Sequence, residues 1–161
     1  MVYYLRNDGR ALVVVDHVLD AQRFGRQDLQ EPVIPENASA ESEHPAIWLV
    51  RHGETDANAE GKSRGRLEVP LDERGERQAD RAAAWLKQKH VARIVSSPVE
   101  RSLDTARTVA AATGAPLEMD DRLASLNIGD MAGEDGQETQ SQVEEYEQEP
   151  DRPMPGGESF S

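Results

Sequence analysis

A charged run at residues 51–55, Arg-His-Gly-Glu-Thr, directly follows the apolar residues 47–50. At the end of a strand, such a run lies where α/β sheets carry out chemistry. A histidine there can attack phosphorus, Arg51 can hold phosphoryl oxygens in its planar fork, and Gly53 lets the backbone approach a substrate closely. The run therefore predicts phosphoryl transfer through a phosphohistidine on His52. Taken alone the signal is weak, because a surface turn with incidental charges explains it equally well.

Short apolar runs alternate with helical patterns in the region that must position this histidine. Residues 47–50 and 91–95 are apolar and rich in β-branched side chains, as in buried parallel strands. Residues 75–90 and 98–113 carry apolar side chains at helical spacing, and Gly114 is expected to end the second helix. The βαβ order predicts an α/β fold, with helices on both faces of a mostly parallel sheet in a three-layer α/β/α arrangement.

Three further blocks follow the Arg-His-Gly run in order. They are Asn58, residues 64–79, and residues 96–106, which include Arg101 in a Ser-Ser-Pro-x-x-Arg setting. Together with the Arg-His-Gly run, these blocks resemble the histidine phosphatase superfamily, the group that contains the cofactor-dependent phosphoglycerate mutases. The resemblance extends over residues 46–161 and implies a phosphoglycerate mutase-like domain.

The resemblance also implies roles for individual residues. His52 must be neutral to attack, so its other ring nitrogen needs an acceptor, which a backbone carbonyl could provide. Arg51 and Arg101 would hold the non-bridging oxygens of the phosphoryl group. The expected substrate-binding residues are Asn58, Arg64, Gly53 and Thr55.

Some of the neighbouring charges have a simpler interpretation. A solvated helix arginine is the alternative for Arg101, although its setting favours the phosphate role. For Lys62, Arg66 and Arg74 we expect solvated charges that at most steer a substrate.

One position departs from the family pattern. The family usually places a proton-donating glutamate in a segment that corresponds to residues 123–133, and the residue at that position here is Ser125. A serine hydroxyl does not titrate near neutral pH, and losing such a donor typically costs about 10²–10⁴ in rate. Asp56, Asp130 and Glu134 are the nearest carboxylates, and each is expected to be a solvated surface charge. Either another group donates the proton, or turnover is slow.

A second catalytic histidine is expected from the resemblance, after a later strand. No histidine follows His90, and residues 153–159 resemble the family's Gly-Glu-Ser helix start, so the domain is expected to be incomplete at its C-terminus. His17, after the apolar residues 11–15, could substitute in a permuted chain. A lone histidine after a strand is more often structural or solvated, however, and we interpret His44 in the same way.

The N-terminal part lies outside the resemblance. Residues 1–26 are expected to form a β-hairpin appendage, because two apolar segments, 2–5 and 11–15, flank an Asp-Gly turn. Residues 27–45 are expected to be a polar linker that contains prolines, which joins the hairpin to the domain at 46–161.

Composition narrows the classes of partner. The net charge of −13 over 161 residues argues against nucleic acid and anionic membranes. Zero cysteines fit a cytoplasmic protein, and there is neither a membrane-spanning run nor a signal peptide. The resemblance implies neither a metal nor a cofactor. The expected partner is phosphate or a phosphorylated small molecule, and a homo-oligomer is left open.

The sequence thus predicts a phosphomonoester hydrolase that acts through His52. One alternative is a non-catalytic phosphate-binding or interaction module, which Ser125 and the early end of the chain favour. The other is a phosphoglycerate mutase-type phosphotransferase, which is disfavoured because the spacing from Arg101 to Gly129 leaves little room for an enclosed phosphoglycerate site.

Overall fold

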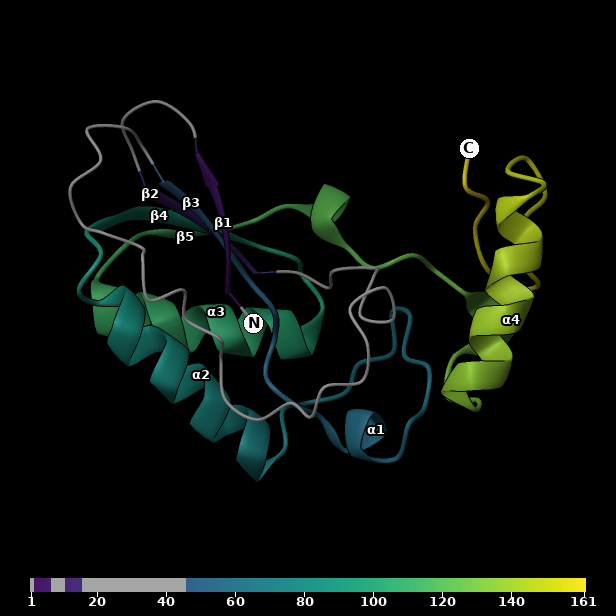
Figure 1. Cartoon of the computed structure of the whole chain (residues 1–161), viewed down its shortest axis with the longest axis horizontal. Helices are drawn as coiled ribbons and strands as arrows, with labels where there is room; N and C mark the ends of the chain where they lie inside the picture. The colour runs from purple at the N-terminus through teal and green to yellow at the C-terminus, as the bar shows by residue number, and fades with distance from the viewer. Residues whose placement is uncertain (1, 7–10, 16–45) are drawn as a thin grey trace.

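The computed structural model describes residues 2–6, 11–15 and 46–161 (Figure 1). Within this part, one sheet contains five strands in the order β1-β3-β2-β4-β5. The strands β2, β3, β4 and β5 run parallel to one another, and β1 runs antiparallel to β3. The strands are β1 (Val2–Arg6), β2 (Ala11–Val15), β3 (Ala46–Val50), β4 (Val91–Ser96) and β5 (Leu117–Met119).

The α-helices of the described part are α1 (Asp56–Ala59), α2 (Glu73–Leu86), α3 (Glu100–Thr113) and α4 (Gly136–Glu147). Two short 3₁₀ helices, η1 (Asp121–Leu123) and η2 (Gly129–Met131), lie between β5 and α4. The side chain of Asp72 begins α2 by accepting a hydrogen bond from Gly75 N at 2.7 Å. Gly114 ends α3 in the left-handed conformation, with φ of 73°, as its position in the sequence predicted.

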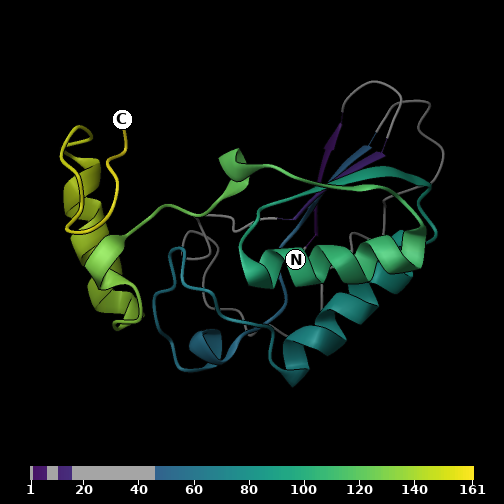
Figure 2. The same cartoon turned by 180° about the vertical axis from the view of Figure 1, so that it is seen from behind.

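These elements confirm the α/β class and the mostly parallel sheet. The helices α2 and α3 lie on the same side of the sheet in both views (Figures 1 and 2). The sequence predicted helices on both faces of the sheet. Among the described residues, long helices cover only the face on which α2 and α3 lie. The core contains Trp48 and Ile94 from the sheet together with Leu86 and Val109 from the two helices. Trp48 also meets Trp85 of α2 edge to face, with 4.7 Å between ring centroids.

The predicted N-terminal hairpin is wrong, because β1 and β2 do not pair with each other. The two strands lie on opposite sides of β3, where Val2 and Val15 both pair with Val50. The other side of β2 pairs with β4, so that Val15 also lies opposite Ser96. A strand of sequence Ala-Leu-Val-Val-Val is typical of a central position in a parallel sheet. Both strands therefore belong to the main sheet, and the predicted linker at 27–45 lies outside the described residues.

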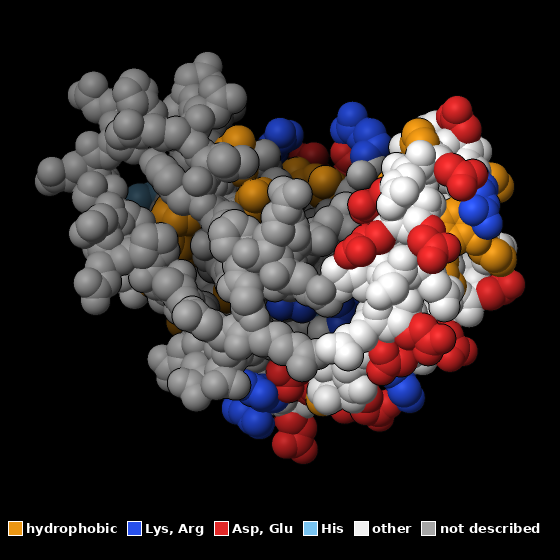
Figure 3. Space-filling view, turned by 45° about the vertical axis from the view of Figure 1, so that its right-hand side comes forward, with side chains coloured by type: hydrophobic (Ala, Val, Ile, Leu, Met, Phe, Trp, Pro, Cys, Tyr) orange, Lys and Arg blue, Asp and Glu red, His pale blue; other side chains and the backbone are white. Residues whose placement is uncertain are grey.

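The segment that carries α4 has a separate, smaller core. Figures 1 and 2 show α4 set apart from the sheet. Its apolar residues pack around Ile128, Met131 and Met154. Backbone hydrogen bonds tie it to the loop after α1, from Ser63 N to Glu134 O and from Gly136 N to Gly61 O. Asp and Glu side chains gather over this part of the surface (Figure 3). None of the described helices is long and apolar enough to cross a membrane.

Candidate active site

His52 lies buried just beyond the end of β3, with 5% of its surface exposed. Its Nδ1 lies 2.6 Å from the carbonyl oxygen of Gly53. Because a carbonyl can only accept, Nδ1 carries the proton and Nε2 carries the lone pair. This backbone acceptor confirms the one that the sequence predicted. The result is an imidazole with its tautomer fixed and Nε2 as its nucleophilic atom.

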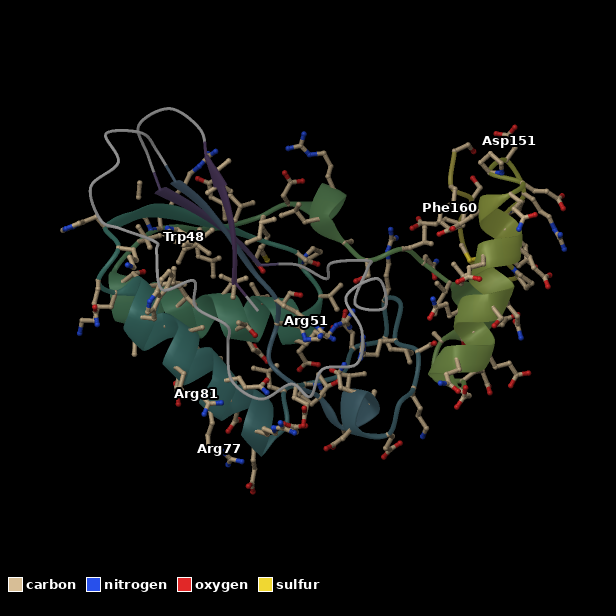
Figure 4. All side chains as sticks on the ribbon, viewed as in Figure 1. Trp48, Arg51, Arg77, Arg81, Asp151 and Phe160 are labelled. Carbon is tan, nitrogen blue, oxygen red and sulfur yellow. The ribbon has the colours of Figure 1, made fainter. Side chains whose placement is uncertain are left out.

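Three arginines surround this imidazole with positive charge. Burial, together with the charges of Arg101, Arg51 and Arg64, lowers the pKa of His52 to about 2, against the opposing effect of the hydrogen bond to Gly53. His52 is therefore neutral over the physiological pH range. Figure 4 shows Arg51 between the sheet and α1.

Arg64 belongs to the same cluster. Burial, followed by the charges of Arg101 and Arg51, lowers the pKa of Arg64 to about 10, so it stays a cation at neutral pH. Its Nε is buried without a hydrogen-bond partner among the described residues. A buried N–H next to two other cations is suited to a bound anion, since it would supply both the missing acceptor and the missing negative charge.

Arg101 lies at the start of α3 with 1% of its surface exposed. Its Nη1 donates to Leu67 O at 3.0 Å, and its Nη2 donates to Gly65 O at 2.9 Å and to Ser125 Oγ at 3.1 Å. The solvated arginine that the sequence left as an alternative is therefore wrong. These contacts also place Ser125, the residue at the family's acid position, directly against the arginine cluster.

Thr55 and Asn58 form a reciprocal cap at the start of α1. Thr55 N donates to Asn58 Oδ1 at 3.2 Å, and Asn58 N donates to Thr55 Oγ1 at 3.3 Å. The Thr55 hydroxyl is fully buried and also donates to Asn58 Oδ1. Thr55 thus holds the loop in place. The bonds to Oδ1 fix the side-chain amide of Asn58 and leave its NH₂ group as the donor that can address a substrate.

Gly53 is required by the packing of the loop. A Cβ at this position would meet the carbonyl group of Gly75, and a Cβ at Gly75 would meet the carbonyl of Glu54. The two glycines let the loop after β3 lie directly on the first turn of α2. A hydrogen bond from Gly53 N to Thr105 Oγ1 at 3.1 Å ties the same loop to α3. The loop that carries His52 is therefore held by both long helices.

Arg66 supports the site, although the sequence predicted a solvated charge. Its Nε donates to Ser125 O at 2.8 Å, and its Nη2 donates to both carboxylate oxygens of Glu158 at 2.9 and 3.0 Å. Glu158 also accepts from Asn127 N at 2.7 Å. This network fixes the backbone on either side of Leu126, so Arg66 is a positioning residue. The Gly-Glu-Ser pattern was the only signal in the sequence that pointed to Glu158.

The other charges near the site pair away from the arginine cluster. Arg74 meets Glu54 at 3.3 Å, and Lys62 meets Glu60 at 2.6 Å. Both basic side chains are about half exposed, as the sequence predicted for them. No group of three or more His, Cys, Asp or Glu side chains within the described residues has the arrangement of a metal site.

Comparisons with known proteins agree with this geometry. The model of the histidine phosphatase superfamily (branch 1) matches residues 47–161. The probable phosphoglycerate mutase GpmB of Escherichia fergusonii is 41% identical over 83 residues, which cover 52% of this chain and 39% of that protein.

Solved structures give the same result. A mycobacterial glucosyl-3-phosphoglycerate phosphatase superimposes with a TM-score of 0.57 and 32% identity, over 68% of this chain and 53% of that chain. A protein of Thermus thermophilus superimposes with a TM-score of 0.53 and 31% identity, over 70% of this chain and 63% of that chain. This chain thus spans less than two thirds of each of these relatives. Because the family model matches most of the chain, including the whole arginine and histidine cluster, this chain belongs to the histidine phosphatase superfamily.

Proposed function

We propose that the protein is a phosphomonoester hydrolase that acts through a phosphohistidine intermediate on His52. The observation that carries this proposal is a buried neutral imidazole with its lone pair on Nε2, surrounded by three guanidinium groups. A phosphoryl group is the ligand that such a site suits best, because it is both an electrophile for the imidazole and an anion for the arginines.

Each residue has a defined task in this reaction. The lone pair of His52 Nε2 attacks phosphorus while the Gly53 carbonyl keeps the proton on Nδ1. The P–O bond of the ester breaks at the same time, and its electron pair leaves on the oxygen of the departing alcohol. Arg51, Arg64 and Arg101 balance the negative charge of the phosphoryl oxygens. Arg101 is already held in place by its bonds to Leu67 O and Gly65 O, which favours the transition state. The NH₂ group of Asn58 donates to the same oxygens. Water then releases inorganic phosphate and restores the neutral histidine.

The relatives support hydrolysis without fixing the substrate. One solved relative is a phosphatase of a phosphorylated glycerate, and a curated relative is a probable mutase. The mutase remains the alternative reaction, in which the phosphohistidine returns its phosphoryl group to an organic acceptor. The non-catalytic binding module is the second alternative, and Ser125 against Arg101 is the observation that favours it.

The proposed setting of the reaction follows from composition. We place the enzyme in the cytoplasm, with a small phosphorylated molecule as substrate and with neither nucleic acid nor a membrane as partner. The net charge of −13 and the lack of cysteine support this assignment.

A rapid-quench experiment separates these functions. The protein is mixed with a radiolabelled aryl phosphate, quenched in alkali, which preserves phosphohistidine, and assayed for bound label and free phosphate. We expect label on the wild type and on Arg107→Ala, an exposed change on α3, and none on His52→Asn. Equal phosphate release by the wild type and His52→Asn would exclude the proposal. Phosphate binding without label or turnover would establish the binding module. Transfer of the label to an added organic acid would establish the mutase.

A further inference from the structure

We propose that Gln78 is a positioning residue that keeps the proton of His52 on Nδ1 and so leaves the lone pair on Nε2. It acts through the peptide group that joins Gly53 to Glu54. The proposal rests on the function proposed above and deepens it, because it names the side chain of α2 that prepares the nucleophile.

The peptide group between Gly53 and Glu54 is bonded at both of its polar atoms. Its carbonyl oxygen, on Gly53, accepts from Nδ1 of His52 at 2.6 Å. Its N–H, on Glu54, donates to Oε1 of Gln78 at 2.8 Å. An N–H can only donate, so the oxygen of the Gln78 amide is the atom that faces Glu54. The imidazole and one side chain of α2 therefore hold the two ends of the same peptide group.

The geometry of a peptide group couples these two hydrogen bonds. The group is planar, and in its trans form the C=O and the N–H point in opposite directions. The bond to Gln78 therefore also sets the direction of the carbonyl that His52 uses. Glycine imposes few steric limits on rotation of its backbone, so Gly53 by itself does not fix this direction. A carbonyl that turned away would release the proton of Nδ1, and a proton on Nε2 would remove the attacking lone pair.

The two neighbouring peptide groups are anchored separately. The N–H of Gly53 donates to Oγ1 of the buried Thr105 at 3.1 Å. The carbonyl of Glu54 accepts from Asp72 N at 3.0 Å. Neither bond involves the peptide group that faces the imidazole. Gln78 therefore provides the side-chain bond that fixes this group directly.

The same bond affects the basicity of the imidazole. Hydrogen bonds at both ends of a peptide group polarise each other, so the Gly53 carbonyl becomes a stronger acceptor. Burial and the arginine charges lower the pKa of His52 to about 2, and the hydrogen bond to Gly53 acts in the opposite direction. A stronger acceptor leaves more electron density on the ring, which makes Nε2 a better nucleophile. Loss of the Gln78 oxygen should therefore slow phosphorylation more than it weakens substrate binding.

The variants Gln78→Met, Gln78→Glu and Gln88→Met separate this role from a structural one. Methionine has a similar length but no oxygen, whereas glutamate keeps an accepting oxygen. Gln88 is exposed and lies beyond the end of α2, so Gln88→Met is the matched control.

Nitrogen-15 NMR of the free protein reads the position of the ring proton. His17 and His44 lie outside the described residues, and His52→Asn identifies the ring signals of His52 among the four histidines. We expect Nε2 of His52 to carry a proton in a measurable fraction of Gln78→Met molecules. It should be unprotonated in the wild type, in Gln78→Glu and in Gln88→Met.

The rapid-quench experiment gives a second readout. Gln78→Met should label His52 about 10²-fold more slowly at saturating substrate, with little change in the concentration needed for half-maximal labelling. Gln78→Glu should recover most of this rate. A merely structural role would lower the amount of folded protein and leave the ring proton and the labelling rate of the folded molecules unchanged.

Two results would overturn the inference. One is a ring of His52 in Gln78→Met that has the same protonation as in the wild type. The other is a wild-type Glu54 N–H that exchanges with solvent as fast as an unbonded loop amide, and this measurement needs no variant to fold. Because the ring is observed in free protein, a wild type that takes no label would remove the proposed function, whereas an unchanged ring in Gln78→Met would remove this inference alone.

Discussion

The change Arg101→Lys isolates the hydrogen bonds of the arginine from its charge. Arg101 is almost fully buried and donates to Leu67 O, Gly65 O and Ser125 Oγ through two nitrogens of one planar group. Lysine keeps the positive charge, so the repulsion from neighbouring arginines stays. Its single ammonium cannot reproduce the planar fork that reaches both carbonyls. At least one of the two carbonyls therefore loses its donor.

The expected cost follows from that lost bond. A polar group left unsatisfied in a buried site costs about 1–3 kcal/mol. We therefore expect the free energy of unfolding to fall by about 1–3 kcal/mol in Arg101→Lys, and turnover to fall by about 10²-fold as an oxyanion donor is displaced. The matched control is Arg107→Lys on the same helix. Arg107 makes one exposed contact with Asp104 at 2.9 Å, so its replacement should change stability by less than about 0.5 kcal/mol.

Urea unfolding measures both variants. The fluorescence of Trp48 and Trp85, which meet in the core, reports the transition. Arg101→Lys should lower the midpoint clearly, with an unchanged slope, and Arg107→Lys should overlay the wild type. If the two variants unfold at the same urea concentration, the bonds of Arg101 to the loop do not stabilise the fold, and the reasoning is refuted.

Three other predictions concern the pH response, the packing and the support of the site. The folded-state pKa of His52, at about 2, is below its unfolded value of 6.5, so stability is lost as the pH falls below 6.5. Between about pH 8 and pH 5 the wild type should lose about 2 kcal/mol more than His52→Asn in parallel urea titrations, and equal losses would refute the low pKa. Gly75→Ala should lower the melting temperature even though alanine favours a helix more than glycine does, because the new Cβ would meet the backbone carbonyl of Glu54. The control Arg81→Ala, on the same helix, should not lower it. A higher melting temperature in Gly75→Ala would contradict this close contact between the two glycines. Arg66→Ala should lower the free energy of unfolding by about 1 kcal/mol and reduce turnover, because it removes the bonds to Ser125 O and Glu158. Replacement of the exposed Lys62 by alanine should do neither. Equal losses in the two variants would show that Arg66 does not position the site.

The parts of the site that the sequence predicted depend on short stretches of chain. The histidine and its arginine follow a strand directly, and the second arginine opens a helix, so their positions follow from the βαβ pattern. The carbonyl that fixes the tautomer of His52 belongs to the next residue, Gly53. The stop at Gly114 is also local, since it needs only the left-handed conformation that glycine adopts readily.

The features that the sequence did not predict depend on pairing between distant segments. The apolar run at residues 11–15 was compatible with a hairpin, and only the assembled sheet places it between β3 and β4. Arg66 and Glu158 are 92 residues apart, and no pattern along the chain links them. The close contact of Gly53 with Gly75 depends likewise on how α2 docks on the loop after β3.

The central claim is that Nε2 of His52 carries the phosphoryl group, and nitrogen-15 NMR of the histidine ring tests it most directly. Free protein should show a neutral ring with Nδ1 protonated and Nε2 unprotonated, unchanged to about pH 5 because the pKa of His52 is about 2. After mixing with acetyl phosphate, Nε2 should shift and couple to phosphorus while Nδ1 keeps its proton. A ring that titrates near its ordinary pKa, or phosphorus that couples to Nδ1 or to no nitrogen of His52, would contradict the account.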